Sequence, residues 1–316
     1  MKKTYKILVT GATGFVGSNL VRRLISNGHD VHILTRNLSN KWRLVDCISD
    51  LHNHTVDLLN QEELKRLMTE IEPDVIFHLA TSGMYGGVQR PDTEVIETNL
   101  LGAVNLINAC NDIDYKCFIN TGSSSEYGPK KEPMKETDLC EPVNLYGISK
   151  CAATLYGQSI AWTMDKPIIG LRLFSPFGPF DDKSRLMTYA ITNALANKPL
   201  LLGNPNAVRD YIYIEDVLDI YLQSMERASE FKGEVFNVGS GSQTSISYIV
   251  NKIIEITGSK SEIKWNSFSG RAHDTEKWEA DIKKISRLFN WRPKYNIDDG
   301  IRQTISWFEN NLQLYK

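Results

Sequence analysis

Tyr146 and Lys150 are the residues whose types and spacing point most directly to chemistry. They are four positions apart, so in a helix both side chains lie on one face. An unperturbed tyrosine titrates near pKa ~10, and a neighbouring ammonium favours the phenolate, which brings the pKa of the phenol toward working pH. The pair is therefore a candidate proton donor, although ordinary surface residues show the same spacing.

A glycine-rich turn near the start of the chain predicts a dinucleotide site. An apolar run ends at Thr10, and glycines follow at intervals of three before an amphipathic helical stretch. Glycine allows a pyrophosphate to approach the backbone, and the helix N-terminus supplies free N–H groups and partial positive charge. The spacing is not the usual Gly-x-Gly-x-x-Gly, so the prediction depends on the strand-turn-helix context. The predicted cofactor residues here are Gly11, Thr13, Gly14, Phe15, Val16 and Gly17.

A serine-rich stretch, residues 121–126, follows an apolar strand at 117–120. The carboxyl ends of strands in a doubly wound sheet line the ligand crevice, so hydroxyls placed there face a substrate. Taken alone, such a stretch is more often only a loop. Ser123 or Ser124 can supply the hydroxyl beside Tyr146, depending on the length of the turn.

The alternation of strand-like and helical stretches predicts the fold class. Apolar runs at 6–10, 31–35, 54–58, 75–79, 117–120 and 167–173 alternate with helical stretches that include 92–110 and 146–164. We predict an α/β protein, a Rossmann-type doubly wound parallel sheet with right-handed crossovers and a smaller C-terminal α/β substrate lobe. The expected dinucleotide-binding domain is 1–175, with 212–240 returning to it. The expected substrate lobe comprises 176–211, which includes a helix at 184–197, and 241–316.

Composition limits the class of protein. With 316 residues and 41% hydrophobic content, the chain is long enough for one Rossmann layer and a lobe. A net charge of −2 favours neither nucleic acid nor an anionic membrane as partner. The first strand begins without a long apolar leader, so we expect a cytoplasmic protein without a membrane span. The five cysteines lack paired metal spacing, so we expect reduced thiols and no metal site.

Further motifs occur in a recognisable order along the chain. With the glycine turn, the serine-rich stretch and the Tyr-Lys pair, they resemble the extended short-chain dehydrogenase/reductase family, or NAD-dependent epimerase/dehydratase family, and within it the nucleotide-sugar modifying enzymes. The resemblance covers nearly the whole chain. The motifs are His78-Leu79-Ala80, Asn99, residues 172–179, 209–217 and 236–241, and a tail with Arg271, Asp281 and Trp291.

The resemblance implies a role for each matching residue. Ser123, Tyr146 and Lys150 would form the catalytic triad, and Asp57 would hold the adenine edge. Further cofactor contacts are expected from Leu58, Leu79, Ala80, Thr81 and Asn99, and substrate contacts from Ser82, Ser175, Arg185, Arg209 and Arg271. The arginines would pair with the diphosphate of a sugar nucleotide as forked donors.

The identity of the nicotinamide cofactor follows from charge. The residue after the second strand lies beside the adenosine ribose, where a carboxylate suits NAD and an arginine suits the extra phosphate of NADP. Arg36 occupies this position, and no acidic residue follows until Asp46. NADP(H) is therefore the predicted cofactor and NAD(H) the alternative. A single arginine in a loop is more often only a solvated surface charge, and this is the alternative interpretation of Arg36.

Cofactor choice bears on the reaction. Relatives that reduce a substrate use the phosphate-bearing pool, so we expect an NADPH-dependent reductase of a nucleotide-linked 4-keto-6-deoxy or 3,6-dideoxy hexose, of the kind that serves polysaccharide biosynthesis. The alternative is a 4-epimerase or 4,6-dehydratase that retains its cofactor. Dehydratases of the family carry a Thr with a Glu two positions later, which Ser124 and Glu126 would reproduce. A non-catalytic nucleotide sensor is a third reading. The resemblance also implies a homodimer formed through the helices at 92–110 and 146–164.

Overall fold

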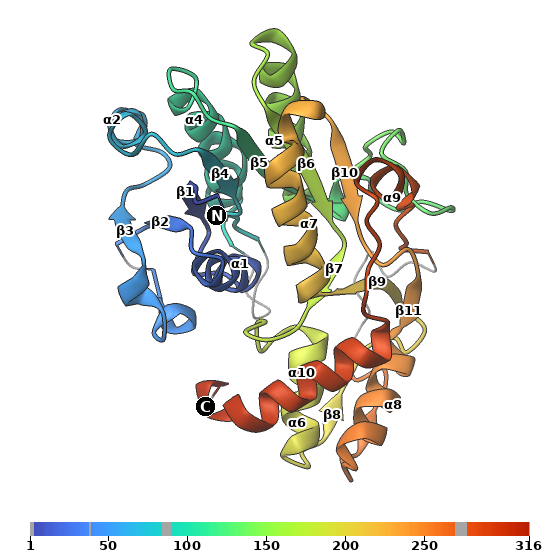
Figure 1. The fold of residues 1–316 in the computed structure, drawn as a ribbon. Helices are drawn as coiled ribbons and strands as arrows, with labels where there is room; N and C mark the ends of the chain where they lie inside the picture. The colour runs from blue at the N-terminus through green and yellow to red at the C-terminus, as the bar shows by residue number, and fades with distance from the viewer. Residues whose placement is uncertain (1–2, 38, 84–89, 269–276, 316) are drawn as a thin grey trace.

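The computed structural model describes residues 3–37, 39–83, 90–268 and 277–315. Its centre is a seven-stranded sheet of order β10-β6-β5-β4-β1-β2-β3, with every neighbouring pair parallel (Figure 1). The strands are β1 (Lys6–Thr10), β2 (Asp30–Thr35), β3 (His52–Thr55), β4 (Val75–His78), β5 (Cys117–Ser123), β6 (Ile168–Leu173) and β10 (Val235–Val238).

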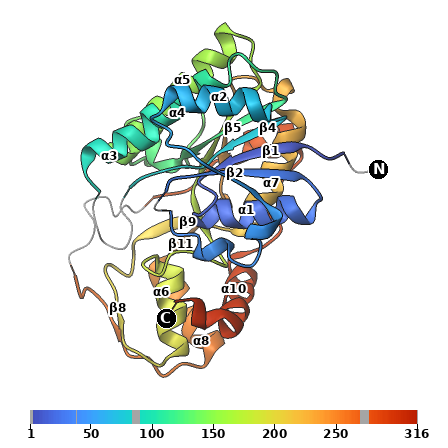
Figure 2. The same cartoon turned by 90° about the vertical axis from the view of Figure 1, so that its left-hand side faces the viewer.

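Helices cover both faces of this sheet (Figure 2). One face carries α1 (Phe15–Ser26) and α7 (Ile214–Arg227), and the other carries α2 (Gln61–Ile71), α4 (Gly102–Ala109) and α5 (Leu145–Thr163). Successive strand residues point to opposite faces, so Ile7 and Val9 pack in the first layer while Leu8 packs in the second. Burial on both faces explains why the central strands read as continuous apolar runs.

The rest of the chain forms a smaller lobe at one end of the sheet (Figure 1). Its helices are α6 (Leu186–Leu195), α8 (Ile246–Thr257) and α10 (Ile297–Asn311). Short strands β8 (Leu200–Leu201) and β12 (Ile263–Lys264) pair beside them. A second sheet of β7 (Ser175–Phe177), β9 (Val208–Tyr213) and β11 (Gln243–Ser245) lies between the lobe and the main sheet, and α9 (Lys283–Phe289) packs on β10.

The predicted fold class is confirmed, and two strand boundaries need correction. β3 begins at His52 and ends at Thr55, whereas the sequence predicted 54–58, because Val56 and Leu58 are buried by packing outside the strand. β5 continues through Ser123, three residues beyond the prediction, because residues 121–123 pair with β6. The serine-rich stretch is thus partly strand.

The predicted helix over 92–110 contains a π-helical turn, residues 97–101, between α3 (Asp92–Ile96) and α4. Such wide turns often occur at functional sites. All five cysteines are free thiols. Among the described helices, none is both long and apolar enough to cross a membrane.

Candidate active site

The strand order fixes where the site lies. From β1 the chain first builds outward through β2 and β3, and then returns to the other side of β1 with β4. Ligands of doubly wound sheets bind at this reversal, outside the carboxyl ends of the strands. The loops after β1, β4 and β5 lie at this edge, and these loops carry many of the predicted residues.

The glycine turn after β1 is shaped for close backbone approach. Gly11 has a φ of 71°, and a Cβ on it would lie 2.5 Å from the carbonyl carbon of Leu79. A Cβ on Gly17 would lie 2.2 Å from the carbonyl oxygen of Gly11. Gly14 begins α1 without a side-chain cap, and the first turn of α1 holds no acidic residue. The free N–H groups of this helix end suit a pyrophosphate. Thr13, Phe15 and Val16 lie in the same turn.

The loop after β4 is fastened to β1 by Thr10. The Thr10 hydroxyl accepts a hydrogen bond from the Ala80 N–H at 3.2 Å and contacts His78 Nδ1 at 2.8 Å. Burial, with a smaller contribution from the Lys150 ammonium, lowers the pKa of His78 to about 3, so this imidazole is neutral at pH 7. The backbone of Leu79 and Ala80, two of the predicted cofactor residues, is therefore fastened to β1.

Asn99 in the π-helical turn organises the same loop. Its side-chain oxygen accepts hydrogen bonds from the Ser82 N–H at 2.7 Å and the Thr81 hydroxyl at 3.1 Å. Its amide donates to the Ser82 carbonyl at 2.8 Å and to Ser149 Oγ on α5 at 3.0 Å. Asn99 thus ties the loop after β4 to the helix that carries Tyr146, and within these contacts it acts as a scaffold.

Local packing brings the start of α5 to the end of β5. The Asn144 side chain caps α5 by accepting from the Gly147 N–H at 2.8 Å. A Cβ on Gly147 would lie 2.4 Å from the Ser125 carbonyl oxygen, so only glycine allows this approach. The consequence is that Tyr146, the second residue of α5, lies beside the last residue of β5.

Tyr146 faces two hydroxyls. Burial raises the pKa of its phenol, and the neighbouring Ser123 and Thr81 hydroxyls lower this pKa by less. The net shift is upward, opposite to the lowering that the sequence predicted. A neutral phenol at pH 7 is the form that a proton donor requires. Gly83 packs on the ring, since a Cβ there would lie 3.1 Å from Tyr146 Cδ2.

Lys150 follows one helical turn after Tyr146 and is 3% exposed. Its ammonium has no hydrogen bond and no ion pair with any other residue that the structure describes. Burial lowers the pKa of Lys150 to about 8, although Glu126 opposes the shift. A buried cation without a partner costs stability, and such groups are concentrated at functional sites.

The two candidate serines point to different partners. Ser123 Oγ contacts Tyr146 and also accepts from the Ser125 N–H at 3.1 Å. Ser124 Oγ instead accepts from Trp278 Nε1 at 3.1 Å, in a buried contact with the C-terminal part of the chain. Ser123, and not Ser124, therefore supplies the hydroxyl beside the phenol of Tyr146.

Glu126 is fully buried and its carboxylate is occupied. One oxygen accepts from the Ser123 N–H at 2.8 Å and from the Thr154 hydroxyl at 3.1 Å. The other pairs with Arg172 Nε at 2.7 Å, and Arg172 also stacks on the ring of Tyr127. This arrangement holds the end of β5 in place, and each oxygen already has a donor.

The residues predicted to flank the adenosine part of the cofactor lie after the ends of β2 and β3. Arg36 directly follows β2 and is exposed, and its backbone N–H donates to Ser39 Oγ. Asp57 is exposed, and its carboxylate accepts from the Leu59 N–H at 2.9 Å. The carbonyl of Leu58 accepts from Asn105 on α4. Asp57 thus remains open to solvent at the carboxyl side of the sheet.

The predicted substrate residues lie on the lobe side of the site. Ser175 begins β7, and Arg185 precedes α6, where it donates to the Pro176 carbonyl and pairs with Asp181 at 3.5 Å. Arg209 on β9 stacks over Trp278, 5.3 Å from the ring centroid. Arg271 and the loop beyond Gly83 fall outside the described residues.

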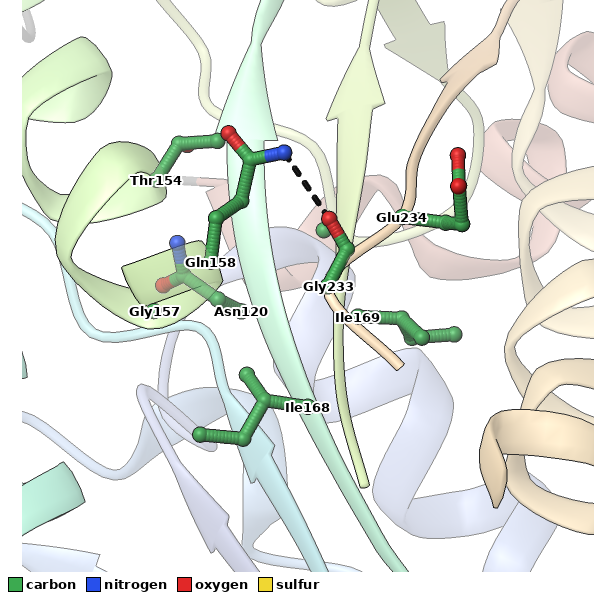
Figure 3. A pocket seen from close by; sticks show the side chains of 9 residues that line it. Asn120, Thr154, Gly157, Gln158, Ile168, Ile169, Gly233 and Glu234 are labelled. Atoms are coloured by element: carbon green, nitrogen blue, oxygen red, sulfur yellow. Dashed lines mark hydrogen bonds between the residues drawn. The ribbon is translucent and has the colours of Figure 1, made fainter. Parts of the chain in front are cut away.

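A small cavity is lined by residues of α5, β5 and β6 (Figure 3). Asn120, Gly157 and Gln158 are among its lining residues, and its volume is about 10 Å³, room for about one water molecule. Gln158 closes one side by donating to the Gly233 carbonyl at 2.8 Å. The cavity is too small for a nucleotide, so it belongs to the packing between α5 and β6.

Sequence reasoning did not identify Trp278 or the partner of Glu126. Arg172 offered a signal, because a charged residue inside the buried strand β6 requires an opposite charge nearby. Trp278 offered none, since it contacts Ser124 across 154 positions.

Comparison with known proteins shows the family of this chain. The NAD-dependent epimerase/dehydratase family model matches residues 7–239. A CDP-paratose 2-epimerase from Salmonella typhi is 28% identical, covering 96% of this chain and 98% of that protein. The UDP-glucose 4-epimerase of Thermotoga maritima, solved with UDP-glucose, is 27% identical with a TM-score of 0.88, covering 97% and 99%.

The UDP-glucuronic acid 4-epimerase of Bacillus cereus, solved with UDP-glucuronic acid and NAD, gives the same identity and coverage, with a TM-score of 0.87. The family model spans most of the chain, including the glycine turn, Ser123, Tyr146 and Lys150. This chain belongs to the NAD-dependent epimerase/dehydratase family of extended short-chain dehydrogenases/reductases.

Proposed function

We propose that this protein is an NADPH-dependent reductase of a nucleoside-diphosphate 4-keto-6-deoxy or 3,6-dideoxy hexose. The cradle formed by Gly11, Gly14 and Gly17 fits a dinucleotide, because an added Cβ at Gly11 or Gly17 would collide with backbone. When bound there, a reduced nicotinamide supplies a hydride for C4 of the sugar. The remaining steps belong to the side chains described above.

Tyr146 is the proton donor in this proposal. Its raised pKa keeps the phenol protonated at pH 7, so a proton is available as negative charge develops on the C4 oxygen. Ser123 lies beside the phenol and can donate a hydrogen bond to the C4 oxygen. Lys150, buried and without a partner among the described residues, stabilises the phenolate that proton transfer leaves.

The main support for a net reduction is the positive charge at the end of β2. Arg36 is exposed there, and residues 36–45 contain no carboxylate to accept from the ribose hydroxyls of NAD. Arg43 adds a second cation beside the glycine turn, since its guanidinium donates to the Thr13 carbonyl at 3.3 Å. This arrangement supports NADP(H) as cofactor, because arginine pairs with a phosphate through a planar fork.

The first test is cofactor retention and exchange. The protein is denatured, any released dinucleotide is identified by chromatography, and the apoprotein is titrated with NADPH and NADH. Readily exchanging sites with preference for NADPH support the reductase. Stoichiometric NAD that does not exchange would contradict it.

Tyr146→Phe tests the donor separately. We expect NADPH affinity to persist and turnover to fall by roughly 10²–10⁴-fold, since the variant keeps the ring and loses the proton. Normal turnover in Tyr146→Phe with bound cofactor would remove Tyr146 from the mechanism.

A 4-epimerase that retains its cofactor is the second candidate. The comparisons support this reading, because the UDP-glucuronic acid 4-epimerase that resembles this chain was solved with NAD. A dehydratase has less support, because both oxygens of Glu126 accept from Ser123, Thr154 and Arg172. The cofactor test above separates the reductase from the epimerase.

We further propose a homodimer through α3, α4 and α5. Ile148 and Leu155 lie seven residues apart on one side of α5 and are 49% and 57% exposed, and Leu101 in the neighbouring π-helical turn is 45% exposed. A cluster of exposed apolar side chains on helices is typical of a protein interface. Leu155→Arg should yield monomers in sedimentation experiments. Leu201→Arg, at a similarly exposed leucine in the lobe, serves as control, and an equal effect of both substitutions would contradict this interface.

A further inference from the structure

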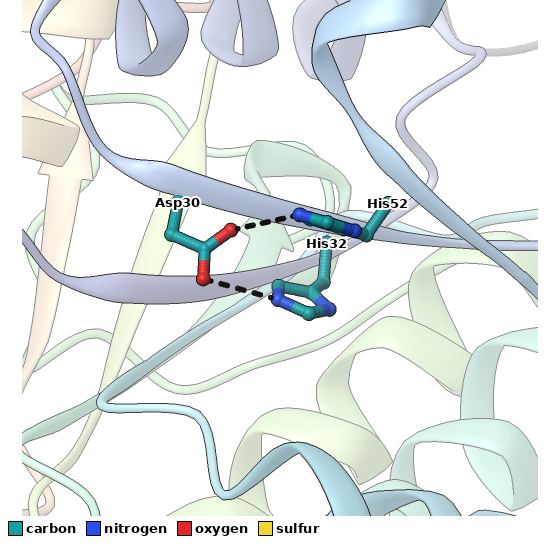
Figure 4. Close-up of side chains that lie close together, drawn as sticks. All are labelled: Asp30, His32 and His52. Atoms are coloured by element: carbon teal, nitrogen blue, oxygen red, sulfur yellow. Dashed lines mark ion pairs between the residues drawn. The ribbon is translucent and has the colours of Figure 1, made fainter.

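Four ionisable side chains gather on one face of β2 and β3, away from the cofactor site. Asp30 and His32 alternate along β2, and His52 and His54 alternate along β3. His32 pairs in register with His52, so Asp30, His32 and His52 converge (Figure 4). Asp30 is the first residue of β2, whereas the cofactor site lies beyond its carboxyl end.

The distances within this cluster match the spacing of metal ligands. Asp30 Oδ1 lies 3.2 Å from His52 Nε2, and Asp30 Oδ2 lies 3.5 Å from His32 Nε2. Ligands held tetrahedrally at zinc distances of about 2.0–2.1 Å stand roughly 3.3 Å from one another. A ligand atom from each of the three residues can be chosen so that all lie within 4.8 Å of one another.

His32 is poised as a ligand through its Nε2 atom. This atom is buried, and its 3.5 Å contact with Asp30 is too long for a good hydrogen bond, so within the described part of the chain it lacks a hydrogen-bond partner. On the other side of the ring, Nδ1 contacts His54 Nε2 at 2.9 Å. When Nδ1 donates to His54, Nε2 carries the lone pair that a metal requires, and such second contacts orient metal-bound histidines.

The charge and the access at the cluster also suit a cation. Asp30 brings a negative charge beside the two imidazoles of His32 and His52. Glu70 on α2 adds a further negative charge near His54. The side chain of His52 is 64% exposed, so the set is open to water on one side.

We propose that Asp30, His32 and His52 bind a divalent transition metal, with Zn²⁺ as the ion that their two imidazoles and one carboxylate fit best, and that His54 positions His32. The open side leaves a fourth coordination position to water. The bound ion would link the edge strand β3 to β2. This inference is independent of the proposed reaction, because the cluster contains none of the cofactor or substrate residues.

The test uses the full chain without a histidine tag, treated with chelator and titrated calorimetrically with Zn²⁺. We expect one ion per chain. His52→Ala and Asp30→Ala should each weaken binding by about 100-fold or abolish it, and His54→Gln should weaken it by roughly 10-fold, the lower end for a positioning contact. His29→Gln, a histidine outside the cluster, serves as control and should leave binding unchanged. Unchanged binding in both His52→Ala and Asp30→Ala, or no saturable binding by the unmodified chain, would overturn the proposal.

Co²⁺ absorption supplies a second readout that identifies the ligands. Another group of possible ligands exists at Glu126, Cys140 and Cys151, and cysteine ligation would show as an intense thiolate-to-cobalt band in the near ultraviolet. We expect visible cobalt bands without that thiolate band, and their loss in His52→Ala. A thiolate band that persists in His52→Ala would assign the metal to the cysteines. Circular dichroism and retained dinucleotide binding confirm that each variant is folded.

Discussion

Lys150 and Arg172 are two buried cations near the same carboxylate, and they differ in how that burial is compensated. Lys150 is 3% exposed and Arg172 is 4% exposed. Arg172 donates to Glu126 at 2.7 Å and stacks on Tyr127, whereas Lys150 has neither a hydrogen bond nor an ion pair with another described residue. Burial lowers the pKa of Lys150 to about 8, while the charge of Glu126 helps to raise the pKa of Arg172 against burial.

The contrast separates a structural cation, Arg172, from Lys150, the cation that we propose to be functional. A buried charge with a complete set of partners fixes geometry, as the Arg172–Glu126 pair does for the backbone of Ser123. A buried charge without partners costs stability and is available to a ligand or a developing charge. Lys150 stands one helical turn from Tyr146, where that availability serves the proposed chemistry.

The largest expected effect comes from breaking the paired cation. Glu126→Gln keeps an oxygen for the Ser123 N–H but leaves Arg172 charged and buried, so we expect a loss of about 3–5 kcal/mol in the free energy of unfolding. Urea denaturation measures this loss. The double variant Glu126→Gln/Arg172→Met should recover part of it, and a loss below about 1 kcal/mol in Glu126→Gln would show that the pair does not fix the core.

Lys150→Met should instead raise the free energy of unfolding. The pKa of Lys150 falls from 10.5 to about 8 in the folded protein, and at about 1.36 kcal/mol per pKa unit the charged form costs on the order of 3 kcal/mol at pH 7. The variant should gain up to this amount in unfolding free energy and lose both turnover and NADPH affinity.

The pH dependence of the unfolding free energy, compared between the parent protein and Lys150→Met, tests whether the buried charge causes this difference. Between pH 8 and 10.5 the unfolded chain binds more protons at Lys150 than the folded chain, so the stability of the parent protein rises with pH relative to Lys150→Met. The difference in unfolding free energy should therefore shrink across this window. A constant difference would mean that Lys150 is not destabilised by burial of its charge.

Arg36 extends the comparison to an exposed cation. Arg36→Ala should weaken NADPH binding by roughly 10–100-fold, the equivalent of a charge-assisted hydrogen bond, and leave NADH binding nearly unchanged. Fluorescence titration with both cofactors gives the ratio. Arg66→Ala, at an exposed arginine on α2, is the matched control. Equal losses for NADPH and NADH would remove Arg36 from phosphate recognition.

The smallest expected effect distinguishes the two serines. Ser124→Ala removes the acceptor of Trp278 Nε1 and should cost about 1 kcal/mol of stability without lowering turnover per folded molecule. Ser123→Ala should lower turnover instead, because it removes the hydroxyl beside Tyr146. A turnover defect confined to Ser124→Ala would reverse the assignment.

The sequence predicted the parts of the molecule that depend on neighbours along the chain. The glycine turn, the parallel sheet and the helix carrying Tyr146 and Lys150 all follow from local apolar patterns and glycine positions. The limits of β3 could not be predicted, because Val56 and Leu58 are apolar for packing reasons and do not belong to the strand.

The choice between Ser123 and Ser124 depended on contacts across long stretches of chain. Trp278 donates to Ser124 from 154 positions away along the chain. Arg172 pairs with Glu126 from 46 positions away. The direction of the Tyr146 pKa shift likewise depends on burial, which the Tyr-x-x-x-Lys spacing does not reveal. The sequence pattern therefore predicts which side chains are candidates for the chemistry. Their protonation states and hydrogen-bond partners depend on tertiary packing.

The most direct test of the proposed reduction follows the transferred hydrogen. The protein is supplied with NADPH carrying deuterium at the transferred position and with 4-keto-6-deoxy hexoses linked to CDP, GDP, dTDP and UDP. We predict stoichiometric oxidation of NADPH with one of these substrates and deuterium at C4 of the product. Interconversion of 4-epimers of a nucleotide sugar without net oxidation of NADPH, and without deuterium in the sugar, would contradict the reductase and establish the epimerase.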